Sequence, residues 1–386
     1  MAVTAHFVDD DWVLQNRTLR FLYVTHPHTS DVLASVLMDR CLFLYNLENK
    51  ISSIVVDNCT TNDSMMDILL GKFDSSSLML VGKFLHMRCS AHILNLIVKD
   101  GLEVIGSGIE RIRECIAFWV ATPKRYEKFE DSARFLRIQA TKKIHLDCKT
   151  RWNSTYLMLD SALPYKANFE RLKRMNARLN FSLPNADDWK FAEMICEKLK
   201  IFYDVTLLIS GRNYPTVNLV FRLICEIKLN LESWANSDVE IISGMTYRMI
   251  AKFDKYWSEM NGLLAIASIL DPRNKLDCVD FYFKKIYRVE ASREIQRITS
   301  LLYDLLVEYV DKRIETPITE DPIVSTPLST SDSLVSQKGP SGGNCQDRYA
   351  AHKKTKKRRV NLKSELDHYL EEDVMPDIKQ FDILDF

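Results

Sequence analysis

The stretch that most constrains the fold is residues 51–63, ISSIVVDNCTTND. The apolar, β-branched run over residues 51–56 predicts a strand buried on both faces, because stiff Val and Ile side chains pack well on a sheet covered on two sides. The run stops at Asp57, and both Asp57 and Asn58 can bend the backbone by bonding it. The strand therefore brings the Asp57 carboxylate to the carboxyl edge of a sheet, where open α/β folds build their sites. Taken alone, these residues favour an Asx turn that caps the next helix.

The segments around this strand predict a small mixed α/β sheet. Residues 2–8 and 12–24 indicate two strands joined across the acidic turn at residues 9–11. A helix capped within residues 29–31 follows, and after the strand at 51–56 come a helix near 63–70, a strand at 84–89 and a helix at 90–98. This order of strands and helices is typical of an α/β domain, which we place at residues 1–101.

From Leu102 onward the pattern changes to long helices with almost no strand signal. Apolar stripes predict helices near residues 109–120, 154–175, 189–209, 217–234, 241–260 and 292–312. In the best of them, residues 189–209, the cap is expected to be Asp187 or Asp188. The fold class is therefore α/β plus all-α, with a helical domain over residues 102–312.

The composition shifts again after residue 312. Residues 313–351 are dense in Pro, Ser, Thr and Gly and predict a disordered linker, because they cannot bury enough apolar area to offset the cost of ordering. The basic cluster at residues 352–360 favours nuclear import or phosphate contact, with a solvated run of charge as the alternative. Its cations are Lys353, Lys354, Lys356, Lys357, Arg358 and Arg359. Residues 361–386 predict one short helix around 364–370 and an apolar end with nothing to pack on.

Charge and cysteine content limit the class of protein. Lys plus Arg and Asp plus Glu both number 52, so no overall field favours nucleic acid and any electrostatic function has to be local. The nine cysteines include no CxxC, which argues against a disulfide framework and a zinc finger and favours a reducing compartment. No apolar run approaches the roughly 18 residues of a membrane span, so we expect a soluble intracellular protein without membrane contact.

One region does carry a local excess of positive charge. Residues 122–178 hold fourteen Lys or Arg against six Asp or Glu, with aromatic residues interleaved. Basic and aromatic side chains together are typical of a groove that follows a nucleic-acid backbone, although a solvated helix face is the competing interpretation. The candidate phosphate contacts are Lys124, Arg125, Lys128, Lys142, Lys143, Lys149 and Arg151.

Several stretches together resemble the plant hAT-superfamily transposases, and within them the transposase-derived zinc finger BED domain-containing proteins of the Ricesleeper and Daysleeper type. They include TAHFVDDDWVLQNRTLRF, SIVVDNCTTND, RCSAHILNLIVKDGL, LDCKTRWNSTYLML, KFDKYWSEMNGLLAIASILDPRNKLDCVDFYFKKIY and SELDHYLEEDVMPDIKQFDILDF. The stretches follow in the same order over nearly the whole chain.

This resemblance implies an RNase H-like sheet interrupted by a large helical insertion. The family's chemistry uses two aspartates and a glutamate to hold divalent metal ions that activate attack on DNA phosphodiesters. Asp57 matches the second aspartate, whereas the strand with the first and the motif with the glutamate are expected beyond the two ends of this sequence. Because one carboxylate of three is present, we expect a vestigial site without catalysis, and no cofactor unless an intact Mg²⁺ site exists. Because the strand with the first aspartate is expected beyond the start of this sequence, we expect an incomplete or rearranged sheet.

The resemblance also draws attention to three further residues. Cys89 and His92 match a CxxH family motif, yet without a second half-site we expect a packed His at a helix start and no bound metal. Trp152, in TRWNS, resembles the family tryptophan placed near a flipped base, and burial in the helical core is an equal alternative.

We therefore expect a catalytically inactive, transposase-derived nuclear protein whose partner is DNA and which takes no small-molecule substrate. Residues 361–386 match the start of the family's C-terminal dimerisation segment, so we expect weak homodimerisation. Two alternatives stay open: the core of an active hAT transposase whose ends are missing from this sequence, and a helical protein-interaction scaffold without affinity for DNA.

Overall fold

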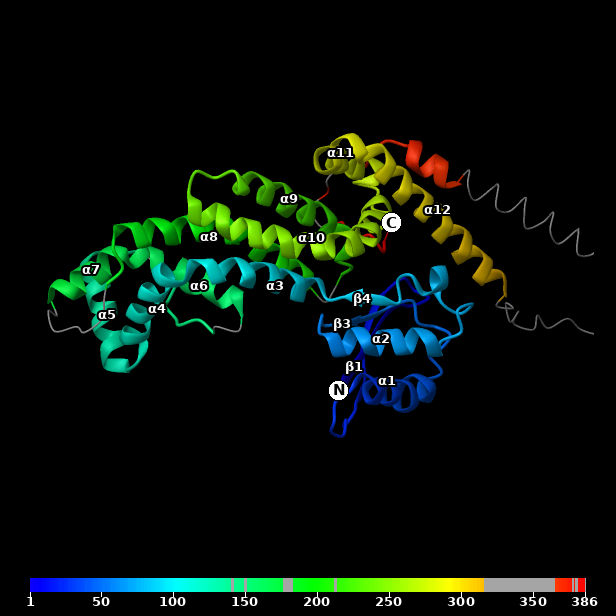
Figure 1. Ribbon diagram of the computed structural model, residues 1–386, viewed down its shortest axis with the longest axis horizontal. Coiled ribbons are helices and arrows are strands. Elements are labelled where there is room, and N and C mark those ends of the chain that lie inside the picture. Colours follow the sequence, from blue (N-terminus) through cyan, green and yellow to red (C-terminus); the bar gives the residue numbers. More distant parts are fainter. Residues whose placement is uncertain are drawn as a thin grey trace, which may run out of the picture.

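The computed structural model describes residues 1–139, 142–148, 151–175, 183–211, 214–315, 365–376, 378 and 381–385. A small α/β part at the N-terminus lies beside one end of a long helical block (Figure 1). The predicted linker from residue 316 onward, the basic cluster at 352–360 and Lys149 lie outside the described residues.

Within the described residues, the strands form two separate two-stranded sheets. Strands β1 (Ala2–Val8) and β2 (Leu14–Phe21) pair antiparallel, whereas β3 (Ile54–Val56) and β4 (His86–Arg88) pair parallel in the register Ile54↔His86. Residues from both sheets, among them Val3, Leu19, Ile54 and Val56, nevertheless pack against one hydrophobic core. The described strands therefore form two small sheets over one core and not one continuous mixed sheet.

The prediction of a strand buried on both faces was wrong. Strand β3 is only three residues long, and the side chain of Val55 is 62% exposed. Ile54 and Val56 face the core, where helices α1 (Ser30–Leu37) and α2 (Thr60–Lys72) cover them. Because β3 has one neighbouring strand and one covered face, its apolar run has an open side that the sequence pattern does not reveal.

The helical block begins with α3, directly after β4. Its helices are α3 (Ser90–Leu102), α4 (Gly106–Val120), α5 (Pro123–Phe135), α6 (Trp152–Ala162), α7 (Lys166–Met175), α8 (Ala186–Ile209), α9 (Val217–Ala235), α10 (Glu240–Ile269), α11 (Lys275–Tyr287) and α12 (Ala291–Glu315). They share one core, filled by large side chains such as Trp189, Phe202, Phe221 and Phe283. The predicted helix at 154–175 is divided in two at Pro164, which cannot donate a helical hydrogen bond.

Polar contacts help to attach the α/β part to this block. Arg88, at the end of β4, donates to Glu259 of α10. The backbone N–H of Leu80 donates to Glu308 of α12 over 2.6 Å, within a turn where Leu80, Val81 and Gly82 all have positive φ angles. A β-branched residue such as Val81 is rare in that conformation, so the turn is strained and the Glu308 carboxylate helps to hold it.

The expectation that the apolar end at residues 381–386 has nothing to pack on was wrong for Phe381, whose ring centroid lies 4.4 Å from the Arg273 guanidinium. The short helix predicted around residues 364–370 is present. A helix at residues 365–371 lies against the helical block, with Leu366 only 7% exposed (Figure 1). Its apolar side chains join the block's core because α10, α11 and α12 leave a site for them, which local sequence patterns cannot show.

Candidate functional site

The carboxyl edge of the parallel β3–β4 pair carries the sequence-predicted Asp57. This residue follows β3 directly, is exposed, and accepts a 2.6 Å hydrogen bond from the side-chain amide of Asn62. Asn62 lies in the first turn of α2, whose N-cap residue is Cys59 without a side-chain cap bond. Asp57 is therefore fastened to α2 through Asn62 and does not itself cap the helix.

An ion-pair network centred on Arg88 lies at the same edge. The Arg88 guanidinium donates to Asp63 of α2 over 2.7 Å and to Glu259 of α10 over 2.5 Å, and it lies 5.8 Å from the ring centroid of Tyr256. Burial lowers the pKa of Arg88, but the two carboxylates outweigh it and hold that pKa above its ordinary value. Arg88 therefore stays charged and is paired with the carboxylates of Asp63 and Glu259.

His86 lies next to this ion-pair network. Its Nε2 is buried and has no hydrogen-bond partner among the described residues, and the nearest Asp63 oxygen is 3.9 Å away. Burial, and then the positive charge of Arg88, hold the pKa of His86 below its ordinary value. The imidazole is therefore neutral at pH 7, so this long contact with Asp63 is not an ion pair.

The donor set at this edge does not fit a two-metal site. Within the described ranges, no group of three His, Cys, Asp or Glu side chains could hold a metal ion. Asp57 offers one carboxylate, and the neighbouring carboxylates of Asp63 and Glu259 are bonded to Arg88. Two-metal phosphodiester chemistry needs several shared oxygen ligands.

The residues of the CxxH motif lie at the start of α3. Cys89 is the N-cap, its carbonyl accepts from Ile93 N over 3.0 Å, and its own N–H donates to the Val56 carbonyl of β3. His92 follows in the first turn, and both side chains are half-buried. This placement is consistent with a packed helix start.

The predicted DNA-binding residues of α5 lie at the other end of the molecule. Lys124, Arg125 and Lys128 are on α5, at the end of the helical block opposite the sheets (Figure 1). Lys142 forms an ion pair with Asp160, and Arg125 lies 4.0 Å from the ring centroid of Phe118. Lys124, Lys128, Lys143 and Arg151 are exposed and have no carboxylate partner in the part of the chain that the structure describes. We refer to these four as the α5–α6 cations.

Trp152 lies in the core and not on this surface. It begins α6, is 5% exposed, and meets Phe202 edge-on with ring centroids 6.3 Å apart. In this conformation its ring has no free face on which a base could stack, so the structure favours the core interpretation over the base-stacking role.

The segment between α5 and α6 is held by a buried carboxylate. The Asp147 side chain is fully buried; it accepts two 2.7 Å hydrogen bonds from the Arg113 guanidinium of α4 and one from the Thr155 hydroxyl. Burial raises the pKa of Asp147, but these hydrogen bonds outweigh it and keep the pKa below its ordinary value. Asp147 thus anchors the backbone that carries Lys143 and Arg151.

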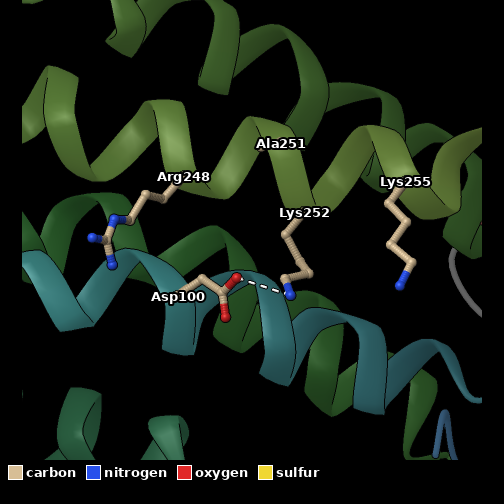
Figure 2. A pocket seen from close by; sticks show the side chains of 5 residues that line it. All are labelled: Asp100, Arg248, Ala251, Lys252 and Lys255. Atoms are coloured by element: carbon tan, nitrogen blue, oxygen red, sulfur yellow. Dashed lines mark ion pairs between the residues drawn. The ribbon is translucent and has the colours of Figure 1, made fainter. Parts of the chain in front are cut away.

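A second basic surface, which the sequence analysis missed, lies between α3 and α10. Figure 2 shows a shallow pocket of about 380 Å³ lined by Asp100, Arg248, Ala251, Lys252 and Lys255. Lys252 is 3.0 Å from Asp100, and Arg248 is 3.3 Å from Glu103. The spacing of Arg248, Lys252 and Lys255 places all three on one face of α10, so the i, i+4, i+7 pattern could have revealed this set.

Three family models match successive parts of the chain. The ZBED1 RNase-like domain covers residues 1–84, the ZBED1 RNase-like helical domain covers 87–198, and the hAT-like transposase, RNase-H fold, covers 218–309. The last match falls on helices α9 to α12.

Similar curated proteins cover the full chain. Zinc finger BED domain-containing protein RICESLEEPER 2 of Oryza sativa subsp. japonica is 34% identical over an alignment of 404 residues, which covers 100% of this chain and 54% of the relative. Putative AC transposase of Zea mays is 35% identical over 388 residues, 100% of this chain and 47% of the relative. Zinc finger BED domain-containing protein DAYSLEEPER of Arabidopsis thaliana is 26% identical over 384 residues, and this alignment covers 100% of this chain and 52% of the relative. The chain therefore spans about half the length of these relatives.

Within the described residues, no helix is long and apolar enough to cross a membrane.

Proposed function

Because this chain belongs to the hAT family of transposases and transposase-derived proteins, we propose that it is a nuclear protein that binds DNA through its helical block and that these 386 residues do not cut DNA by themselves. The observation that carries the binding proposal is the group of α5–α6 cations, which are exposed and have no carboxylate partner among the described residues. Exposed, unpaired Lys and Arg side chains are the groups that displace counterions from a phosphate backbone.

The pocket between α3 and α10 supports a second set of phosphate contacts. Arg248, Lys252 and Lys255 lie along one face of α10, which runs from the helical block toward the sheets (Figures 1 and 2). Asp100 and Glu103 already pair with two of these cations, so this set offers less free positive charge than the α5–α6 cations do.

The arrangement around Asp57 supports the absence of cleavage. A single exposed carboxylate, bonded to Asn62, gives a divalent ion one oxygen ligand, while Arg88 holds the next two carboxylates. The predicted nuclear location is supported by the cluster from Lys353 to Arg359, which lies outside the described residues. Weak homodimerisation remains a proposal that follows from the resemblance of residues 361–386 to the family's C-terminal segment.

The experiment is a salt titration of the purified chain against a labelled DNA duplex, followed by fluorescence anisotropy. If four phosphate contacts are lost when Lys124, Lys128, Lys143 and Arg151 are changed to alanine, the slope of log K against log salt falls in magnitude by about 3 to 4, since each contact contributes about 0.9. A control variant removes the same charge from Lys200, Lys284, Lys285 and Arg293, which are exposed cations on other helices.

The results separate the proposed function from a helical protein-interaction scaffold. A slope that falls in the first variant and not in the control supports a DNA surface at α5–α6. Binding that is absent, or that does not change between low and moderate salt, contradicts it and favours the scaffold.

A second candidate is the core of a longer, active transposase. The exposure of Asp57 at the carboxyl edge of the sheet favours it, because the carboxylate is open to further ligands. Strand cleavage by the 386 residues with Mg²⁺ or Mn²⁺, abolished by Asp57→Ala, would show that these residues form a working site and would overturn the proposed inactivity.

A further inference from the structure

The loop between α10 and α11, residues 270–275, is built around a buried carboxylate. Asp271 is fully buried and accepts hydrogen bonds from the Arg273 guanidinium at 2.9 and 2.7 Å and from the Asn218 amide at 2.8 Å. The Asp271 carbonyl also accepts from the backbone N–H groups of Asn274 and Lys275. These bonds lie within the helical block and shape the loop, and the Arg273 guanidinium also lies 4.4 Å from the ring centroid of Phe381.

Lys275 lies at the centre of the surface that this loop presents. It is 3% exposed and has a positive φ angle of 44°. Its ammonium donates to the backbone carbonyls of Tyr369 at 2.6 Å and Glu372 at 2.9 Å, and the Glu372 carboxylate lies 3.4 Å away. These carbonyls belong to the end of the helix at residues 365–371, where unpaired C=O groups and the helix dipole attract a cation.

The remaining contacts involve the same helix and the residues that follow it. The Tyr369 hydroxyl donates to the Ile269 carbonyl over 2.9 Å, and the Met375 N–H donates to the Pro272 carbonyl over 2.9 Å. The hydroxyl of Tyr303, on α12, bonds Asp367. Leu366 supplies a buried apolar anchor beside these polar contacts.

We propose that residues 270–275 form a preformed binding site for the carboxyl end of an amphipathic helix, with Lys275 as the main recognition residue, and that residues 365–376 of this chain occupy it as a tethered, exchangeable peptide. Exchange is feasible because undocking returns the Lys275 ammonium to water, which offsets part of the loss of contacts. The site is independent of the proposed DNA binding, since it uses none of the same residues.

The test uses the full chain and a fluorescein-labelled peptide of residues 361–386. In the unchanged chain the tethered segment has an effective concentration on the order of mM and excludes the free peptide. The double substitution Leu366→Asp and Tyr369→Ala weakens the tethered segment only, and this opened chain is expected to bind the peptide at least tenfold more tightly than the unchanged chain does.

Adding Lys275→Met to the opened chain is expected to weaken peptide binding at least tenfold, whereas adding Lys275→Arg weakens it less because the positive charge is kept. The matched control is Lys284→Met, an exposed lysine of α11 that pairs with Asp280, and it leaves the affinity unchanged. Circular dichroism verifies that each variant is folded.

Hydrogen exchange of the full chain provides a second measurement. Lys275→Met is expected to accelerate exchange at the Met375 amide, while amides in the middle of α9 and α10 keep their protection. The proposal is overturned if the opened and unchanged chains bind the peptide equally, or if Lys275→Met changes neither the peptide affinity nor this exchange.

Discussion

Replacement of Arg113 by methionine tests how the chain holds the segment between α5 and α6. The substitution keeps most of the side-chain volume and removes the guanidinium that donates two 2.7 Å hydrogen bonds to Asp147. The Asp147 side chain is fully buried and, of its side-chain partners in the described part of the chain, keeps the Thr155 hydroxyl. An ionised carboxylate without a counter-charge then remains inside the protein.

The magnitude follows from the burial of both groups. Removal of one member of a buried ion pair costs about 3 to 5 kcal/mol, and Arg113 is itself only 15% exposed. We therefore expect Arg113→Met to lower the free energy of unfolding by about 3 kcal/mol or more at pH 7. The double variant Arg113→Met, Asp147→Leu removes both charges and is expected to lose less than the single variant, although it leaves the Thr155 hydroxyl without its partner.

The assay is urea unfolding followed by circular dichroism, repeated between pH 4 and pH 7. In the single variant, burial without Arg113 should raise the pKa of Asp147. A carboxyl group whose pKa is raised in the folded state destabilises the fold less as the pH falls and the group becomes protonated. The loss of unfolding free energy in Arg113→Met should therefore shrink toward pH 4.

The control is Arg134→Met on α5, which breaks an ion pair between two exposed side chains and should cost less than about 1 kcal/mol. If Arg113→Met costs no more than this control, or if its cost is the same at pH 4 and pH 7, the reasoning from a buried, charged Asp147 is refuted.

Three further predictions concern pH, thiol chemistry and solubility. The hydrogen bonds from Arg111 hold the pKa of Asp188 below its ordinary value of 3.8, so the stabilisation is present above about pH 4 and is lost as the pH falls through the lowered pKa. Acid unfolding should therefore be less steep for Asp188→Asn than for the unchanged chain. A thiol reagent should modify the exposed Cys59 within minutes and leave Cys225 unmodified until the chain unfolds, because burial raises the pKa of Cys225 well above its ordinary value; mass spectrometry of the labelled peptides measures both. Val55→Lys should reduce light scattering of concentrated samples at little cost in stability, since Val55 is an exposed apolar residue on a short edge strand; increased scattering would contradict this.

Local sequence signals predicted much of the fold. The apolar spacing of residues 189–209 predicted α8, and the polar residues before it predicted a cap. The expected cap, Asp187 or Asp188, was wrong: the cap is Asn185, and Asp188 completes a capping box by accepting from the Asn185 N–H over 2.8 Å. Such signals work because a helix and its caps depend on residues three or four positions apart.

The candidate site was only partly predictable. The end of an apolar run located Asp57 at a strand end, and the collinear motifs gave the family. Whether a basic side chain is free, as Lys124 is, or paired across the chain, as Lys142 is with Asp160, depends on a neighbour many positions away.

The sequence by itself determined the order of elements, most helices and the family, because these follow from short-range periodicity and from motifs read in order. Only the tertiary structure decided that Val55 lies open, that Trp152 is buried against Phe202, and that the C-terminal helix docks on Lys275. Each of these depends on which segments come into contact in the fold. Burial and charge pairing are set by those tertiary contacts and not by any local stretch.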